Sequence, residues 1–414
     1  VGEEATYTLI EKMIAQMARC YASRRIHVGM DEAWHLGRGK FINRFGYKRE
    51  FDIFNEHLKR VVAICKKHGL QPMIWSDMYF RMGGTGYYDP NLNIPADVRA
   101  AIPKDARLVF WDYYQSEKGK YVEGIARHRD LGFEPVMASG VWTWARLWYD
   151  AKTTEANATP CVQACNERNV KDFIFTLWGD DGAYCEFDSS LAGLAYGAEV
   201  AYSGDGYDKK RLARRYKAVC NADYQSVIDA SGLHEYSGST YLWDDPMLGI
   251  IWKNRKITDS KYWNKALAHH KKVAGKLAKL GAVVAPVDLS HSLNVAKCLV
   301  KRTEIGLALD KAYAKRDKTG LSAVRKQIPA MVKLLENVLT SFRRQWYAKH
   351  KTFGFEVIQI RTAGLIERYR ELARRIGELT SGKIDAIPEL DETTGKAYHN
   401  NGHWRKNASG SKIL

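Results

Sequence analysis

The sequence of 414 residues lacks several features that would assign it to a specialised class of protein. No stretch approaches the roughly 18 consecutive apolar residues of a membrane-spanning helix, and the longest apolar runs are short pieces such as residues 281–286. The seven cysteines are an odd number and include no C-x-x-C pair, which argues against a disulfide framework and against a cysteine zinc site. We therefore expect no membrane association, a reducing compartment and a cytoplasmic location.

Acidic residues are scarce in one segment. The net charge is +17, and residues 251–350 hold 22 Lys and Arg residues against 6 Asp and Glu residues. An excess of positive charge of this size can bind nucleic acids or other polyanions. Much of it, however, is lysine dispersed along amphipathic stretches such as residues 261–280, which is typical of a solvated helical face. We expect no nucleic-acid partner, and we expect the segment to pack on the rest of the chain or to form a homodimer face.

Helical and strand-like patterns alternate from residue 5 to about 205. Five short apolar runs without clear alternation, typical of buried parallel strands, lie at residues 25–28, 71–75, 107–111, 134–137 and 172–177. Helical spacing predicts helices at residues 51–68, 121–130 and roughly 154–168. Repeated strand–helix units predict a parallel α/β sheet, either doubly wound or closed into a barrel.

Polar and aromatic residues follow every predicted strand, which favours the barrel. The segments are HVGMDEAWH, WSDMYFRMGG, WDYYQ, ASGVWTWARLWYD and WGDDGAYCEF. A doubly wound sheet concentrates its site at one switch point, whereas a barrel draws one active site from several strand ends. The sequence thus predicts one shared pocket.

The rest of the chain has a different pattern. Residues 206–382 are helical almost throughout, with long helices predicted near 261–280, 290–314, 321–349 and 355–379, and residues 383–414 resemble an irregular tail. We therefore expect a catalytic barrel domain over residues 1–205, an all-helical domain over 206–382 and the tail. Because residue 1 is Val, we also expect a processed N-terminus or a fragment.

Two adjacent carboxylates, Asp31 and Glu32, follow the first predicted strand. In an apolar site the proton affinities of two carboxyl groups can be pushed apart, so that one acts as a general acid while the other stays ionised. That division of labour suits the cleavage of glycosidic bonds. The alternative is a helix start, at which both residues would only complement the helix dipole.

Five tryptophans lie at or just beyond strand ends: Trp75, Trp111, Trp142, Trp144 and Trp178. Indole faces pack against the C–H faces of pyranose rings, so such a set suits a sugar, although each one could instead fill the core. The acidic pair Asp180–Asp181 could accept hydrogen bonds from sugar hydroxyls or could cap a helix.

HVGMDE at a strand end is similar to the His-x-Gly-Gly-Asp-Glu signature of family 20 glycoside hydrolases, the β-N-acetylhexosaminidases. The longer string HVGMDEAWHLGRGKF, with WDYY and LWGDDG downstream, resembles the branch that contains bacterial cytoplasmic-type hexosaminidases and hexosaminidase D. The resemblance covers residues 5–205 and extends through KTFGFEVIQIR at residues 351–361. It implies a (β/α)8 TIM-type barrel, no metal and no cofactor.

The resemblance also implies exo-acting, substrate-assisted retaining hydrolysis of terminal N-acetylglucosamine or N-acetylgalactosamine through an oxazolinium intermediate. Asp31 would orient the acetamido group, Glu32 would be the general acid and base, and His27 would support both. Carried over by position, further residues would bind the sugar, namely Trp75, Trp111, Trp178 and Asp180, while one tyrosine among Tyr113, Tyr114 and Tyr149 would contact the acetamido oxygen.

The sequence departs from the family pattern in two ways. Met30 stands where most of the family has a second glycine. The acidic motif, which belongs to the fourth strand of the family's barrel, lies here on the first predicted strand. The first three βα units are therefore missing from this chain, together with a sugar-binding arginine, and we expect a longer protein or a partner segment to complete the barrel.

Three other functions remain open from the residues alone. His27, Asp31, Glu32 and His35 could form a metal hydrolase site. The basic helical segment could bind a polyanion. A fragment that keeps its tryptophans could bind an N-acetylhexosamine-terminated glycan without catalysis.

Overall fold

The computed structural model describes residues 1–180, 182–280 and 288–392. The chain divides into two compact units that interleave along the sequence. We call the first the barrel unit; it comprises Val1–Gly140, Glu155–Thr176 and Val200–Tyr207. We call the second the helical unit; it comprises Val141–Thr154, Leu177–Glu199 and the chain from Asp208 onward.

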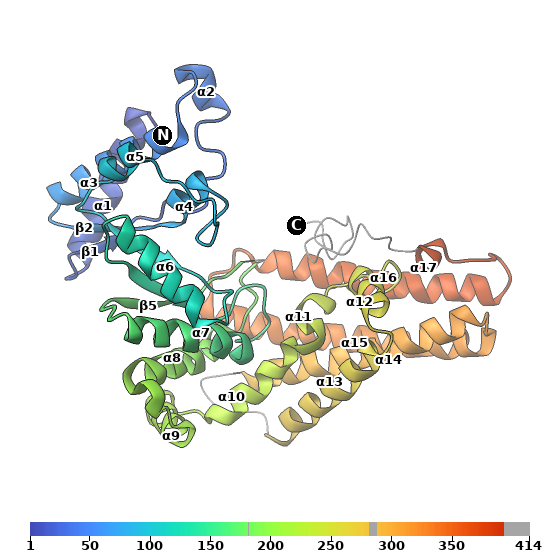
Figure 1. Cartoon of the computed structure of the whole chain (residues 1–414). Coiled ribbons are helices and arrows are strands. Elements are labelled where there is room, and N and C mark those ends of the chain that lie inside the picture. The colour runs from blue at the N-terminus through green and yellow to red at the C-terminus, as the bar shows by residue number, and fades with distance from the viewer. Residues whose placement is uncertain (181, 281–287, 393–414) are drawn as a thin grey trace. The chain divides into compact units, whose positions relative to one another are not determined.

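The barrel part of the chain alternates strands and helices (Figure 1). Its elements in order are α1 (Glu4–Cys20), β1 (Arg25–His27), α2 (Lys40–Phe45), α3 (Glu50–Lys67), β2 (Gln71–Trp75), α4 (Asp77–Gly83), α5 (Ala96–Ala101), β3 (Arg107–Trp111), α6 (Lys118–Asp130), β4 (Val136–Gly140), α7 (Ala151–Glu167) and β5 (Phe173–Thr176).

The five strands form one parallel sheet in the order β1-β2-β3-β4-β5. The register pairs Ile26 with Pro72, Ile74 with Leu108, and Phe110 with Met137. Consecutive strands are neighbours, with one or more helices between them in sequence, so the fold is part of a (β/α)8 barrel. The predicted fold class is confirmed, and all five predicted strands are present.

Helix α3 illustrates why the barrel helices form. Its apolar residues recur at helical spacing and are buried, among them Phe51, Phe54 and Leu58. Acidic residues occupy its first turn and lysines its last, which complements the helix dipole. The chain leaves the helix through Gly69, whose φ of 67° is unfavourable for other residues. The helix then leads directly into β2.

One side of the barrel unit exposes apolar side chains. Leu9, Met13, Met17 and Tyr21 are spaced four residues apart, so they share one face of α1 and its C-terminal end, and they are 43–60% exposed. Within the described residues, β1 pairs with a neighbour on one edge only, and the same holds for β5. An exposed apolar stripe and an open strand edge both fit the expectation of an incomplete barrel.

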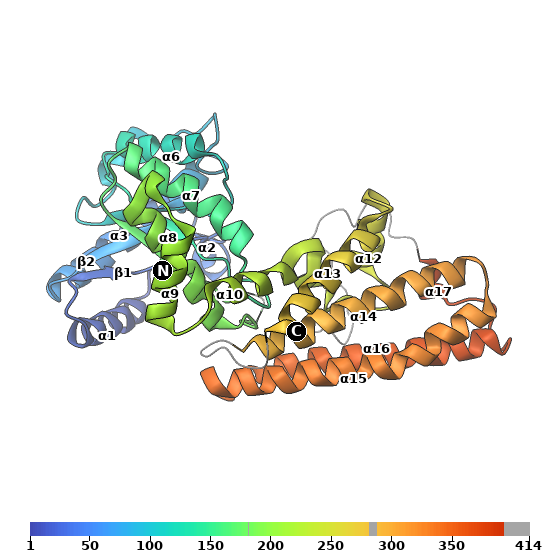
Figure 2. The ribbon, with the colours of Figure 1, turned by 90° about the horizontal axis from the view of Figure 1, so that it is seen from below.

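The helical part of the chain consists of helices and short 3-10 turns. They are η1 (Phe187–Ser190), α8 (Leu191–Ser203), η2 (Gly204–Gly206), α9 (Lys209–Cys220), α10 (Tyr224–Ser231), η3 (Gly232–Ser237), α11 (Gly238–Tyr241), α12 (Ile250–Thr258), α13 (Tyr262–Lys279), α14 (Leu289–Ala314), α15 (Lys318–Lys349), α16 (Phe355–Thr380) and α17 (Pro388–Asp391). Helix α14 packs against α13 and α15, and α15 also packs against α16 (Figure 2). The four long predicted helices are confirmed.

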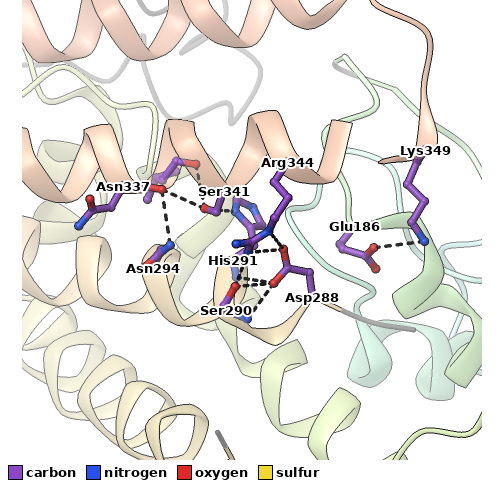
Figure 3. A network of polar contacts seen from close by, with 10 residues as sticks. Glu186, Asp288, Ser290, His291, Asn294, Asn337, Ser341, Arg344 and Lys349 are labelled. Atoms are coloured by element: carbon purple, nitrogen blue, oxygen red, sulfur yellow. Dashed lines mark hydrogen bonds and ion pairs between the residues drawn. The ribbon is translucent and has the colours of Figure 1, made fainter. Parts of the chain in front are cut away.

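A polar network fastens α14 to α15 (Figure 3). Asp288 caps the N-terminus of α14 by accepting hydrogen bonds from the backbone N–H groups of Ser290 and His291. Arg344 of α15 donates to Asp288 Oδ2 at 3.0 and 2.6 Å. His291 Nδ1 lies 2.8 Å from Ser341 Oγ, and burial lowers the pKa of His291 to about 4. The two helices are thus joined by a buried contact between His291 and Ser341 and by a partly exposed ion pair, as well as by apolar packing.

The two units differ from the predicted division at residue 205. Residues 141–154 and 177–199, which follow β4 and β5, belong to the helical unit. The sequence could not show this, because the segments pack against residues far along the chain. In the tail, the structure shows the short helix α17, and residues 393–414 lie outside the described residues.

Among the described residues, the search for a helix with both the length and the apolar character of a membrane span found none.

Candidate active site

The chain turns sharply after β1. Val28 N donates to Met73 O at 2.9 Å, so the strand pairing continues one residue past β1. Gly29, Met30 and Glu32 then have φ values of 78°, 75° and 48°. Positive φ is unfavourable for side chains with a Cβ and is often found at functional sites. The positive φ of Met30 explains why a glycine suits this position in the family that the motif resembles.

Asp77, the first residue of α4, ties the acidic motif to the neighbouring strands. It is 2% exposed, and its Oδ2 accepts the backbone N–H of Glu32 at 3.0 Å. Its Oδ1 accepts the indole N–H of Trp111 at 3.3 Å. Burial is the main cause of its raised pKa, to which the charge of Asp31 also contributes. Asp77 therefore fixes Glu32 and Trp111 relative to each other.

The side chains of Asp31 and Glu32 are exposed, whereas the nearby rings of His27 and Trp75 are not. His27 is half-buried, its ring centroid lies 4.2 Å from that of Trp75, and its Nδ1 accepts the N–H of Gly29 at 3.1 Å. Burial lowers the pKa of His27 to about 4, although the nearby charge of Asp31 acts in the opposite direction. His27 is thus neutral at physiological pH, with its proton on Nε2.

Aromatic residues extend this cluster along β3. Trp111 stacks on Tyr113 with ring centroids 5.2 Å apart, and Tyr113 is 4% exposed. Tyr114 is 62% exposed. The barrel unit therefore brings together most of the predicted site, namely His27, Asp31, Glu32, Trp75, Trp111, Tyr113 and Tyr114.

The segment after β4 lies in the helical unit and forms a closed loop. Trp142 stacks on Trp144 with centroids 4.1 Å apart. Trp142 N donates to Thr154 Oγ1 at 3.0 Å, and Asp150 N donates to Trp142 O at the same distance. Asp150 accepts Arg146 Nε, also at 3.0 Å. Both tryptophans are thus held within one rigid loop.

Distant residues of the helical unit hold this loop. Trp148 is fully buried and donates its indole N–H to Val227 O at 2.9 Å. Ala151 N donates to Ser231 Oγ at 2.8 Å. Tyr149 is also fully buried and is packed so closely that a Cβ on Gly193 would lie 2.6 Å from its ring. Tyr149 is therefore packed within the helical unit.

The segment after β5 joins the same loop. Thr143 Oγ1 donates to Trp178 O at 2.7 Å, and Ala145 N donates to Asp180 O at 3.2 Å. The side chain of Trp178 is 37% exposed, and that of Asp180 is exposed. Asp181 lies outside the described residues. The helical unit thus brings Trp142, Trp144, Trp178 and Asp180 together.

Farther along this segment, Glu186 is a buried carboxyl group with the ammonium group of Lys349 nearby. It is 1% exposed, it accepts the N–H of Ser189 at 2.8 Å, and its Oε1 lies 4.0 Å from Lys349 Nζ (Figure 3). Burial raises the pKa of Glu186 to about 7, although the charge of Lys349 acts against this. The sequence analysis did not identify this residue.

Asp77 is the main site residue that the sequence analysis missed. Its signal was present, because it follows Trp75 by two residues in WSDMYF, one of the five post-strand segments. No group of three or more potential metal ligands occurs among residues 1–180, 182–280 and 288–392, and the set of His27, Asp31, Glu32 and His35 is not such a group.

The lysines of α13 lie on its exposed face, as the sequence indicated. Three of them pair with carboxylates: Lys265 with Asp259, Lys271 with Glu304, and Lys276 with Asp229. A solvated face accounts for this charge without a ligand.

Comparisons with known proteins agree with the motifs. Residues 1–171 match the model of the glycosyl hydrolase family 20 catalytic domain, and residues 215–409 match that of the glycoside hydrolase 20C C-terminal domain. Human (Homo sapiens) hexosaminidase D is 24% identical over 171 residues, which are 39% of this chain and 31% of that protein. The chain therefore covers about a third of this relative's length.

A solved structure, that of a family 138 glycoside hydrolase targeting pectin rhamnogalacturonan II, aligns with 91% of this chain and 79% of its own. The TM-score is 0.37 and the sequence identity is 8%, a likeness too low to support an argument.

Proposed function

Because the chain belongs to glycoside hydrolase family 20, we propose that it removes terminal β-linked N-acetylhexosamine from glycans by substrate-assisted, retaining hydrolysis. In this mechanism the 2-acetamido oxygen of the substrate attacks the anomeric carbon and forms an oxazolinium ion, which water then opens. The protein has to protonate the leaving oxygen, orient the acetamido group and activate the water.

The observation that carries the proposal is the Asp31–Glu32 pair on its turn after β1. Glu32 is the general acid and then the base, and Asp31 orients the acetamido group and stabilises its developing positive charge. The positive φ values of Met30 and Glu32 and the hydrogen bond from Glu32 N to Asp77 support these roles, because they fix the backbone that carries both carboxylates.

The aromatic residues supply the binding surface. Trp75 and Trp111, the last residues of β2 and β3, pack against the faces of the sugar and its N-acetyl methyl group. The sugar-binding roles of Trp142, Trp144, Trp178 and Asp180 stay predictions. One tyrosine among Tyr113, Tyr114 and Tyr149 donates to the acetamido oxygen.

The test is hydrolysis of a chromogenic N-acetyl-β-glucosaminide by the 414-residue chain and by a chain extended at its N-terminus. Glu32→Gln and Asp31→Asn should each lower kcat by roughly 10²–10⁴-fold. The loss in Glu32→Gln should be smaller with an activated aryl leaving group than with a disaccharide, because the aryl group needs less protonation.

Glu56→Gln is the matched control, since Glu56 is an exposed carboxylate of α3, 63% exposed, that pairs with Lys48. It should keep full activity. The mechanism would be excluded if both Asp31→Asn and Glu32→Gln kept the activity, or if the chain also hydrolysed a glucoside without the acetamido group. If neither the 414-residue chain nor the extended chain hydrolysed the substrate, a binding function would be favoured.

We also propose a reducing compartment, which the seven free cysteines support, five of them buried. The homodimer through the helical region stays a prediction.

A further inference from the structure

A cavity lies within the helical unit, and none of the residues that line it belongs to the candidate active site. Its volume is about 320 Å³, close to the lower end of the range for small-molecule sites, and it suits a ligand of monosaccharide size. Its walls come from α12, α14, α16 and α17 and from residues 245–249. Lys256 and Ala314, which line it, are exposed, so the cavity is open to solvent.

Two carboxylates of the cavity wall, those of Asp310 and Asp391, are held by hydrogen bonds and can accept further ones. Asp310 accepts the indole N–H of Trp252 at 3.0 Å and Lys256 Nζ at 2.8 Å, both through Oδ2. Asp391 accepts the hydroxyl of Tyr313 at 3.0 Å, also through Oδ2. A carboxylate has about four acceptor positions, so each can bind further donors.

Two cations of the wall, Arg302 and Lys253, donate to backbone carbonyls. Arg302 is 3% exposed and donates to Leu242 O at 3.4 Å and to Asp244 O. Its Nε has no hydrogen-bond partner within the described residues. Lys253 donates to Glu389 O at 2.8 Å and to Glu392 O at 2.7 Å, which leaves one of its three ammonium donors. A buried donor without a partner is costly, and folded proteins keep few of them.

The cavity wall carries both positively and negatively charged side chains, and this mixture decides the class of ligand. A phosphate would meet the carboxylates of Asp245, Asp310 and Asp391, and an apolar molecule would strip water from charges without replacing it. Hydroxyl groups both donate and accept, so they can match cations and carboxylates at once. Aromatic residues on the wall, including Tyr241 and Tyr369, add apolar surface for the C–H groups of a ring.

We propose that this cavity is a second binding site, specific for a neutral polyhydroxylated ligand of monosaccharide size. It goes beyond the proposed hydrolysis and does not depend on it, because none of its lining residues belongs to the candidate active site. The ligand would sit between α12 and the C-terminal half of α14, with its hydroxyls on Asp310, Asp391 and Lys253.

The test is hydrogen exchange of the full chain with saturating glucose, N-acetylglucosamine or inorganic phosphate. Either sugar should slow exchange in α12 and in the last turns of α14, and phosphate should not. Ala314→Phe fills the mouth of the cavity from an exposed position and should abolish this protection, and Asp310→Asn should weaken it. Ala330→Phe, on the exposed face of α15 and outside the cavity, is the matched control and should keep it.

Three results would overturn the proposal. They are protection by phosphate, protection by the sugars that survives Ala314→Phe, and sugar protection confined to the segments after β1, β2 and β3. The third result would leave the proposed function intact, because it places the sugar at the acidic pair. Loss of hydrolysis in Glu32→Gln with the cavity protection unchanged would show that the two sites are independent.

Discussion

The segments after β1, β2 and β3 differ from those after β4 and β5 in what holds them. The first group is held from inside the barrel unit, where Asp77 joins the backbone of Glu32 to the indole of Trp111. The second group is held by the helical unit, where Trp148 and Ala151 bond to α10. The acidic pair thus depends on contacts within the barrel unit, and the loop that carries Trp142 and Trp144 depends on α10 of the helical unit, to which it belongs.

Two buried aspartates show the electrostatic side of this difference. Asp77 is 2% exposed and Asp150 is 6% exposed. Burial raises the pKa of Asp77, which has the charge of Asp31 nearby and no ion pair among the described residues. Burial acts on Asp150 in the same way, but the imidazole of His234, the charge of Arg146 and the hydrogen bonds from Thr153 and Arg146 outweigh it and lower the pKa of Asp150. At similar burial, the neighbouring charges decide which carboxylate stabilises the fold in its ionised form.

The largest effect should come from Trp148. Trp148→Ala removes a fully buried indole and its hydrogen bond to Val227 O, and should lower the free energy of unfolding by about 3–5 kcal/mol in urea titration. Trp34→Ala in the barrel unit is the control, since Trp34 is 47% exposed and chiefly contacts Arg81. It should cost about 1 kcal/mol at most. Equal losses of unfolding free energy in the two variants would contradict the contrast between the two groups of segments.

Glu186, in the segment after β5, should make stability depend on pH. Its pKa is about 7 in the folded state against 4.5 for the free group, so the unfolded chain loses the proton first as pH rises. The folded state is then progressively destabilised from pH 4.5 to 7, by an amount on the order of 3 kcal/mol. Glu186→Gln should remove this decline while its amide oxygen still accepts Ser189 N. Urea unfolding at both pH values tests this.

Glu336→Gln serves as the control for that experiment, since this side chain of α15 is 46% exposed. It should leave the pH dependence unchanged. A decline of the same size in Glu186→Gln would mean that another buried group causes it.

The smallest effects should come from the two aspartates. Asp150→Asn removes the charge that faces Arg146 and should lower the free energy of unfolding at pH 7 by about 1.5–3 kcal/mol. Asp77→Asn loses one acceptor but also a poorly compensated charge, so it should cost no more than about 1 kcal/mol. Urea titration of both variants measures the difference. The reverse order would contradict the electrostatic contrast between the two groups of segments.

Much of this arrangement follows from local sequence patterns. The predicted runs at residues 71–75 and 107–111 coincide with β2 and β3, because buried parallel strands need continuous apolar residues. Prediction was weaker at β4, which starts at Val136 and runs to Gly140. Pro135 has no N–H for the sheet, Glu134 pairs with Arg129, and Ala-Ser-Gly resembles a turn although all three residues are buried in the strand.

The candidate site could be predicted only in part, for a related reason. Residue type and position after a strand identify Asp31, Glu32 and the tryptophans. No local pattern shows that Asp77 reaches Glu32, 45 residues away, or that the loop of Trp142 and Trp144 packs with residues near 230. Such contacts depend on how the chain returns to itself, which periodicity does not encode.

The interleaving of the two units has a consequence for how the protein is made. The partners of Trp148 and Ala151 lie 79 and 80 residues farther along the chain. A ribosome that adds roughly 5–20 residues per second produces those partners roughly 4–16 seconds later. During synthesis the loop that carries Trp142 and Trp144 therefore lacks these two hydrogen-bond partners until α10 has emerged from the exit tunnel. The backbone around the acidic pair, in contrast, can fold as soon as α4 and β3 are complete.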